Sequence, residues 1–149
     1  MPTIILKTLI NARIENCFDL ARSIDLHLQS MKASGEKAIA GKKSGLIDLN
    51  ESVTWRARHF GIPFEMTNKI STMEYPKLFV DEMVKGPFKK LHHQHQFITI
   101  DSQTEMTDVF EFQAPFGLLG WLVEKIFLKN YMLKLIEKRN KEIKFQAEG

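Results

Sequence analysis

Cysteine, long apolar runs and secretion signals are scarce or missing in this sequence. Among its 149 residues Cys17 stands alone, so no disulfide can form within the chain, as is usual in a reducing cytoplasm. No run of 18 apolar residues occurs, which argues against a transmembrane helix. The N-terminal residues lack the charged and apolar regions of a secretory leader. We therefore predict a cytoplasmic protein without integral membrane association.

Common catalytic and phosphate-binding signatures are missing as well. The chain shows no nucleophile elbow, no Cys–His pair and no metal triad. Gly117 and Gly120 flank two leucines, but no Lys-Ser/Thr pair follows, so this segment is not a phosphate loop and is expected to bend the chain into a helix. The sequence predicts no cofactor, no metal and no assigned catalytic residue, which favours a binding protein over an enzyme.

The composition is that of a globular protein with many aromatic side chains. Hydrophobic residues make up 44% and charged residues 26%, and the length fits one domain over residues 1–149. The eleven Phe residues suggest a large core or an aromatic-lined pocket. The net charge of +3 lies in residues 118–149, where basic and acidic residues alternate. This pattern favours a solvated helix face and no nucleic-acid partner, with a phosphate-binding or anionic-membrane surface as the alternative.

Apolar and polar residues alternate through most of the chain, which predicts an antiparallel meander. Thr3–Ile10 is expected to be the first strand, and two short helices bent near Ser23 should follow it over residues 14–31. The further strands are predicted at Glu36–Ala40, Glu51–Phe60, Ile62–Met73, Lys77–Lys85, Phe88–Ile100 and Thr104–Gln113.

The last part of the chain changes to helical periodicity. Leu118–Phe145 would span roughly 42 Å as one helix. An apolar stripe is expected on it, formed by Leu119, Leu122, Ile126, Leu133 and Ile136. We predict an α+β fold in which a curved antiparallel sheet of about seven strands wraps around this long C-terminal helix. The two short helices after the first strand would close one end, leaving a cavity for a small apolar molecule.

Strand parity predicts which residues face that cavity. The inner face of the last strand carries Met106, Asp108, Phe110 and Phe112, and that of the preceding strand carries Leu91, His93, His95 and Phe97. A tight hairpin at Asp101–Gln103 would set Phe97 opposite Asp108 and His95 opposite Phe110. Continued across the Gly86-Pro87 turn, the same face takes Glu82. A bulge would shift these registers.

Four titratable groups would then share one apolar wall: Glu82, His93, His95 and Asp108. They satisfy one another as buried polar groups, or they orient the polar end of a ligand. A metal bound by His93-x-His95 with a carboxylate is a third interpretation, and acid–base catalysis is a fourth. The residues predicted to contact a ligand are Trp55, Phe64, Glu82, His93, His95, Phe97, Asp108, Phe110, Phe112, Leu119 and Tyr131. For Trp55 a core position, and for Tyr131 the helix surface, are the alternatives.

A set of motifs covers about two thirds of the chain. They are Ser44-Gly45-Leu46-Ile47, Val53-Thr54-Trp55-Arg56-Ala57-Arg58-His59-Phe60-Gly61, Asp81-Glu82-Met83, Gly86-Pro87-Phe88-Lys89, His93-x-His95-x-Phe97, the alternation from Thr104 to Gly117, Tyr131-Met132 and Arg139-Asn140. Together they resemble the polyketide-cyclase/START-like (SRPBCC) superfamily, and most closely its small bacterial members. The last hairpin departs from the pattern, because Asp101-Ser102-Gln103 stands where Gly is common.

This resemblance implies the helix-grip fold, shared with the birch-pollen allergen group, and a small hydrophobic ligand. The ligand would be a lipid or a polyketide-like metabolite, held in a carrier or sensor role. The alternative is a cyclase or dehydrase that uses a His and an Asp of the inner wall as acid and base. A monomer or a homodimer is expected, and Phe116–Trp121 would be a cavity mouth or a site of transient membrane contact.

Overall fold

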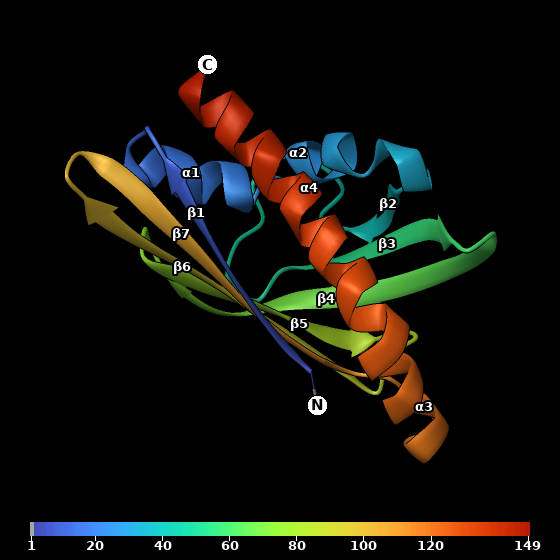
Figure 1. Cartoon of the computed structure of the whole chain (residues 1–149). Helices are drawn as coiled ribbons and strands as arrows, with labels where there is room; N and C mark the ends of the chain where they lie inside the picture. Colours follow the sequence, from blue (N-terminus) through green and yellow to red (C-terminus); the bar gives the residue numbers. More distant parts are fainter. Residues whose placement is uncertain (1) are drawn as a thin grey trace.

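The computed structural model describes residues 2–149, and the side chains of all of these except Leu118, Leu119, Trp121, Lys125 and Ile126. Within this range seven antiparallel strands form one curved sheet in the spatial order β1-β7-β6-β5-β4-β3-β2 (Figure 1). The strands are β1 Thr3–Ile10, β2 Lys37–Gly41, β3 Ser52–His59, β4 Ile62–Glu74, β5 Leu78–Lys85, β6 Lys90–Ile100 and β7 Gln103–Gln113. The predicted meander with the first strand added is thus confirmed.

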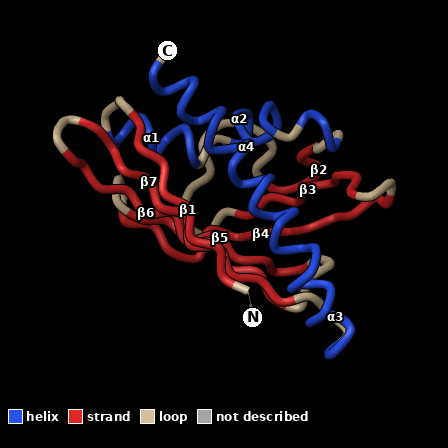
Figure 2. Tube along the Cα trace, viewed as in Figure 1, coloured by secondary structure: helices blue, strands red, loops and turns tan. Residues whose placement is uncertain are grey.

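The helices gather on one side of this sheet (Figure 2). They are α1 Ile14–Ala21, α2 Ile24–Ser30, the short 3-10 turn η1 Lys32–Ser34, α3 Gly117–Val123, the π-helical turn η2 Glu124–Leu128, and α4 Lys129–Glu148. In Figure 1 α4 crosses in front of the sheet, α1 and α2 lie toward one end, and α3 projects at the other. This is the predicted helix-grip arrangement of a sheet around a long C-terminal helix.

Ser23 separates the two early helices, as the sequence predicts. Its backbone is extended, and its side-chain hydroxyl accepts a hydrogen bond from the backbone N–H of Leu26 at 3.1 Å, which caps α2. The Ile24 N–H donates to the carbonyl of Gly45 at 2.9 Å. The cap and this contact hold α2 against the segment that leads into β3.

The core has two parts on the inner face of the sheet. At the α1 end, Phe18 packs its ring against Phe79 and Phe97, with centroids 5.1 and 5.2 Å away, and the fully buried Ile143 of α4 belongs to the same cluster. The second cluster lies along β1, β6, β7 and α4 and consists of Ile4, Leu91, Phe110, Phe112 and Ile136. The helix α4 therefore joins both clusters.

The predicted apolar stripe of the long helix is partly wrong. Ile136 is buried and Leu133 packs against the same cluster, but Leu122 exposes 42% of its surface, and the side chains of Leu119 and Ile126 lie outside the described residues. The π-helical turn at Glu124–Leu128 explains the difference. Each turn of a π-helix holds one residue more than 3.6-residue spacing allows, which rotates the following face by about 100°. A stripe counted from residue 119 does not continue into α4.

The predicted pairing of the last two strands is shifted by two residues. His95 lies opposite Asp108 and Phe97 opposite Met106. The turn is Asp101-Ser102, one residue shorter than the expected Asp101–Gln103, and both residues adopt the left-handed conformation, with φ of 46° and 68°. A shift by two keeps every side chain on its face. The predicted inner faces of β6 and β7 are therefore confirmed although the partners differ.

Candidate functional site

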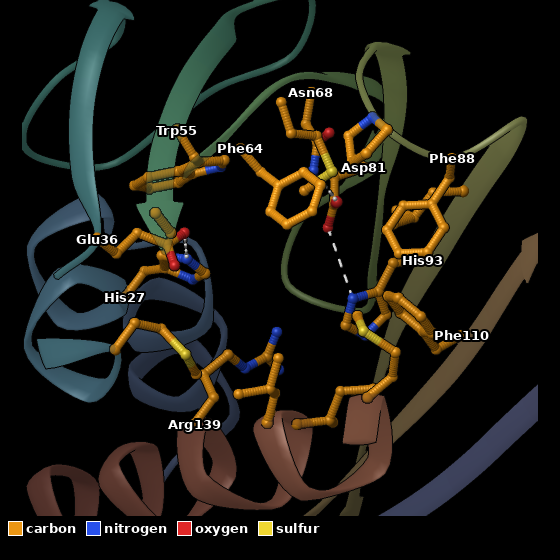
Figure 3. A pocket seen from close by; sticks show the side chains of 18 of the residues that line it. His27, Glu36, Trp55, Phe64, Asn68, Asp81, Phe88, His93, Phe110 and Arg139 are labelled. Atoms are coloured by element: carbon orange, nitrogen blue, oxygen red, sulfur yellow. Dashed lines mark hydrogen bonds and ion pairs between the residues drawn. The ribbon is translucent and has the colours of Figure 1, made fainter. Parts of the chain in front are cut away.

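A cavity of about 510 Å³ lies between the inner face of the sheet and the C-terminal helix. This volume is within the roughly 300–1,000 Å³ of small-molecule sites. Most of the lining is apolar or aromatic, and it comes from α2, five of the strands and the long helix. Figure 3 shows Trp55, His27 and Glu36 on one side of the cavity, Asp81, His93 and Phe110 on the other, and Arg139 rising from the helix.

Six of the eleven predicted contact residues line this cavity: Trp55, Phe64, His93, His95, Phe110 and Tyr131. Phe97 and Phe112 are buried on the same face but pack into the two core clusters. Asp108 is fully buried behind the cavity wall. The side chain of Leu119 lies outside the described residues.

Glu82 does not face the cavity, so its predicted place on the inner wall is wrong. Its neighbour Asp81 pairs with His93 and lines the cavity, whereas Glu82 pairs with His92, and their side chains lie 3.8 Å apart on the outer face. The ladder between β5 and β6 ends at Glu82 and His92, so the connection is a wide loop. The prediction assumed a tight turn at Gly86-Pro87 when it assigned the inner face of β5 from that of β6. Because the connection is wider, the assigned face is wrong by one residue.

Asp108 is the centre of a buried polar cluster. Its carboxylate accepts hydrogen bonds from Asn140 Nδ2 at 2.6 Å and from an Arg139 guanidinium nitrogen at 3.0 Å, and it lies 2.7 Å from His93 Nε2. The side chain of Asp108 is completely enclosed. A buried carboxylate requires such partners, because an unpaired charge in the interior is strongly unfavourable.

Asp81 and His95 extend this cluster toward the cavity. His95 Nε2 lies 2.6 Å from Asp81 Oδ2, and Asn68 donates its amide to Asp81 Oδ1 at 3.2 Å. On its other side His95 Nδ1 lies 3.3 Å from an Arg139 nitrogen. Because Arg can only donate, Nδ1 is the acceptor and Nε2 carries the proton that His95 donates to Asp81.

The surroundings of His95, Asp81 and Asp108 keep the imidazole neutral and both carboxylates ionised. Burial lowers the pKa of His95 to about 3, and the nearby His93 contributes to the same shift, so the imidazole is neutral. Burial alone would raise the pKa of Asp81, but the hydrogen bond from His95 and the surrounding positive groups outweigh it and lower this pKa to about 2. The pKa of Asp108 is lowered further, as Arg139 and His93 overcome its burial.

Sequence reasoning missed four members of this cluster: Asn68, Asp81, Arg139 and Asn140. One signal was present for the last two. Arg139 and Asn140 lie three and four residues after Ile136, and Ile143 follows at seven, which is the spacing of one helix face. These four residues of α4 are all buried. Two polar residues on an apolar helix face therefore indicated a polar partner on the sheet.

Two further polar pairs line the cavity. His27 Nε2 lies 2.8 Å from Glu36 Oε1, and its ring lies over Trp55 with centroids 4.2 Å apart. His59 Nδ1 lies 2.5 Å from the Tyr131 hydroxyl, which joins the β3–β4 hairpin to α4. Phe60, exposed by 54%, packs on Tyr131 with centroids 4.7 Å apart. Together with Phe116, 82% exposed, it marks an aromatic edge of the cavity.

Among the described residues, Asp81, His93 and His95 form the group closest to a metal site, with ligand atoms within 4.8 Å of one another. The hydrogen bonding opposes this use. A metal needs the lone pair of His95 Nε2, but that atom carries the proton given to Asp81, since Nδ1 accepts from Arg139. The guanidinium also adds a positive charge beside the site. The group is better described as a hydrogen-bonded network.

The curved sheet around the long C-terminal helix defines a helix-grip architecture with an internal cavity, and comparisons with known proteins agree on the fold. The family of polyketide cyclases/dehydrases and lipid transport proteins matches residues 28–130. The chain belongs to this family. Of the residues that the structure describes, no helix combines the length and apolar character required to cross a bilayer.

Solved structures with the same fold have low sequence identity to the chain. TTHA0849 from Thermus thermophilus matches with a TM-score of 0.78 at 15% identity, over 98% of this chain and 97% of that one. A START superfamily protein from Mycobacterium smegmatis gives 0.72 at 12% identity, over 98% and 97%. Ginseng major latex-like protein 151 from Panax ginseng gives 0.71 at 13%, over 99% and 98%. No curated protein sequence matches the chain.

We expect the stability to fall on mild acidification because of His95. An ordinary His takes up a proton near pH 6.5, whereas folded His95 does so only near pH 3. Between these values the unfolded chain binds more protons than the folded one. The contribution of neutral His95 to the free energy of unfolding is therefore fully present above pH 6.5. It decreases as the pH falls, by up to about 1.4 kcal/mol per pH unit. Below about pH 4, Asp81 adds to the loss, because its pKa in the folded protein is about 2.

Urea unfolding measured from pH 7 to pH 4 tests this expectation. The variant His95→Gln, which keeps a neutral polar side chain, should show a smaller slope of stability against pH. The matched control His92→Gln, on the outer face of the same strand, should keep the wild-type slope. Equal slopes in all three proteins would contradict the assignment.

Proposed function

We propose that this protein binds a small, largely apolar molecule in its internal cavity and acts as a carrier or sensor of that molecule. The observation that carries the proposal is the cavity itself, about 510 Å³ in volume and lined mainly by apolar and aromatic side chains. A space of this size and polarity favours a hydrophobic ligand, because burial of apolar surface drives its binding. Family membership supports a lipid or a polyketide-like metabolite.

Native mass spectrometry of the purified protein, followed by solvent extraction, is the direct test. We expect a bound apolar molecule of a few hundred daltons, or uptake of one from an added set of lipids and aromatic metabolites. A protein that carries nothing and binds no member of such a set would overturn the proposal.

Filling the cavity should abolish binding without harming the fold. Ala57 is buried on the inner face of β3 and lines the cavity, so Ala57→Phe would place a ring in the space that the ligand needs. We expect the affinity for the ligand to fall at least about tenfold, which corresponds to roughly 1.4 kcal/mol. The thermal midpoint should stay the same or rise, because a filled cavity gains contacts.

The control variant introduces the same phenyl ring one residue away, on the opposite face of β3. Arg56→Phe lies on the exposed outer face of β3 and should leave the affinity unchanged. Undiminished binding by a folded Ala57→Phe variant would show that the ligand is held elsewhere.

An enzyme is the second candidate, favoured by the placement of His93. This residue lines the cavity, and Asp108 lies 2.7 Å from its Nε2 atom, an arrangement that orients a general base. The reaction would be a cyclisation or dehydration of the bound molecule. If so, the molecule extracted from His93→Gln should differ in mass or ring count from that extracted from the wild type, and identical extracts would favour the carrier.

We further propose a cytoplasmic location and a monomeric or homodimeric state. The single thiol, Cys17, is free and completely buried, which suits a reducing compartment. Transient contact with a membrane at the exposed Phe116 is part of the same proposal. Sedimentation with and without lipid vesicles measures both the oligomeric state and this contact.

A further inference from the structure

The two carboxylates that line the cavity have histidine and amide partners rather than arginine partners. Among the described residues that line it, four carry a formal charge besides the histidines: Arg22, Glu36, Asp81 and Arg139. Each of the two arginines is already paired outside the lining. Arg22 binds Asp48 at 2.6 Å and Asp19 at 2.9 Å, and Arg139 binds the enclosed Asp108 at 3.0 Å.

The two cavity carboxylates have histidine partners instead. Asp81 accepts from His95, which is neutral because burial lowers its pKa to about 3, and Glu36 lies 2.8 Å from His27. The negative charge of Asp81 is therefore not cancelled by its closest partner. Its side chain keeps 19% of its surface exposed, whereas Arg139 keeps 8%. The most accessible charged group at the Asp81 end of the cavity is an ionised carboxylate.

Hydrogen-bond acceptors are in surplus at the same place. Both nitrogens of His95 are engaged, and Arg139 uses three of its five N–H groups, toward Asn140, His95 and Asp108. The oxygens of Asp81 accept one bond each, although a carboxylate oxygen has two lone-pair sites. Beside it, Asn68 Oδ1 is enclosed and has no hydrogen-bond partner among the described residues. A ligand group that donates would satisfy the free acceptor sites of Asp81 and Asn68, whereas one that only accepts would leave both unsatisfied.

We propose that the Asp81 end of the cavity selects ligands whose polar end is a hydrogen-bond donor without negative charge, a protonated amine or a hydroxyl, and rejects carboxylates. This inference rests on the proposed binding function and specifies the ligand class. An ammonium gains a charge-assisted hydrogen bond to Asp81, and a hydroxyl gains a weaker one. A carboxylate would lose its hydration beside a like charge.

A matched series of naphthalene probes tests the inference on the wild-type protein. Calorimetry would give the Kd of 2-naphthylmethylammonium, 2-naphthylmethanol, 2-methylnaphthalene and 2-naphthoate at about pH 8, where ordinary imidazoles are neutral. We expect the ammonium to bind roughly tenfold tighter than the hydrocarbon, with the alcohol between them and the carboxylate weakest. Whichever of the ammonium and the alcohol has the lower Kd shows whether the site prefers a charged or a neutral donor.

Asp81→Asn is the matching variant, since it removes the charge and keeps an acceptor. The preference for the ammonium, taken as the ratio of the Kd values of 2-methylnaphthalene and the ammonium in the same variant, should fall to within about twofold. Glu82→Gln makes the same chemical change one residue away, on the outer face, and should retain the wild-type preference.

The outcomes separate this inference from the proposed function. Binding of 2-naphthoate as tightly as the ammonium in the wild type overturns the donor selection, and so does an unchanged preference in folded Asp81→Asn. If that variant does not fold, the wild-type order decides alone. Failure of all four probes and of the broader lipid set overturns the binding function itself, and the donor selection with it.

Discussion

Replacing Asp108 by Asn is expected to lower the free energy of unfolding by about 3–5 kcal/mol. The carboxylate is fully enclosed and compensates the buried guanidinium of Arg139 at 3.0 Å. Asn removes that charge and presents an amide donor to His93 or Asn140, both of which already point donors at this position. The cost therefore exceeds the roughly 1–3 kcal/mol of one unsatisfied polar group, which is what the sequence alone would predict.

Denaturant unfolding at neutral pH measures this loss. The control Glu105→Gln lies on the outer face of the same strand, where Glu105 has only a loose contact with Lys7 at 3.7 Å, and it should cost less than about 1 kcal/mol. The double variant Asp108→Asn/Arg139→Met should be more stable than the sum of the single losses predicts, since it removes both charges. A loss below about 1 kcal/mol for Asp108→Asn would contradict the central role of this carboxylate.

Ile143→Ala is expected to cost about 2–5 kcal/mol, because it opens a cavity in the α1-end cluster. Ile143 is completely buried where α4 meets Phe18 and the sheet. By contrast, Leu122→Ala should cost less than about 1 kcal/mol, as Leu122 is 42% exposed on α3. The two substitutions truncate similar side chains in one continuous helical segment. The difference between their losses in free energy of unfolding therefore shows which part of the segment packs against the sheet.

Thermal and urea unfolding of both variants would check the ranking. Equal losses at the two positions, or a larger loss for Leu122→Ala, would mean that the sheet holds the helix near its start, as the regular 3.6-residue stripe had predicted. The ranking therefore also tests the effect of the π-helical turn at Glu124–Leu128 on the face that α4 presents.

The fold was largely predictable because it depends on local periodicity. Alternation with a period of two marks a strand with one buried face, and it placed His93, His95 and Phe110 toward the cavity even though the pairing of β6 with β7 was shifted. The break in helical spacing near Ser23 predicted the bend between α1 and α2, and the structure shows Ser23 capping α2 there. These signals lie within a few residues of one another, so they need no knowledge of distant partners.

The candidate site was predictable only where a face could be followed along one strand. Asp81 was missed because the connection from β5 to β6 is wide, and a single residue in such a loop exchanges the inner and outer faces. The prediction of the helix face failed for a similar reason, since one extra residue in the π-helical turn changed which side chains meet the sheet. Both errors arise from irregular backbone whose geometry depends on packing rather than on residue type.

By itself, the sequence determined the class of this protein: alternating strands, two short helices and a long amphipathic helix have few ways to bury their apolar faces together. The tertiary structure alone decided the chemistry of the cavity. Arg139 and Asn140 meet Asp108 only because α4 crosses the sheet at β7, 31 and 32 residues away in the chain. That contact neutralises one carboxylate and leaves Asp81 charged toward the cavity, because electrostatic pairing follows distance in space and not in sequence.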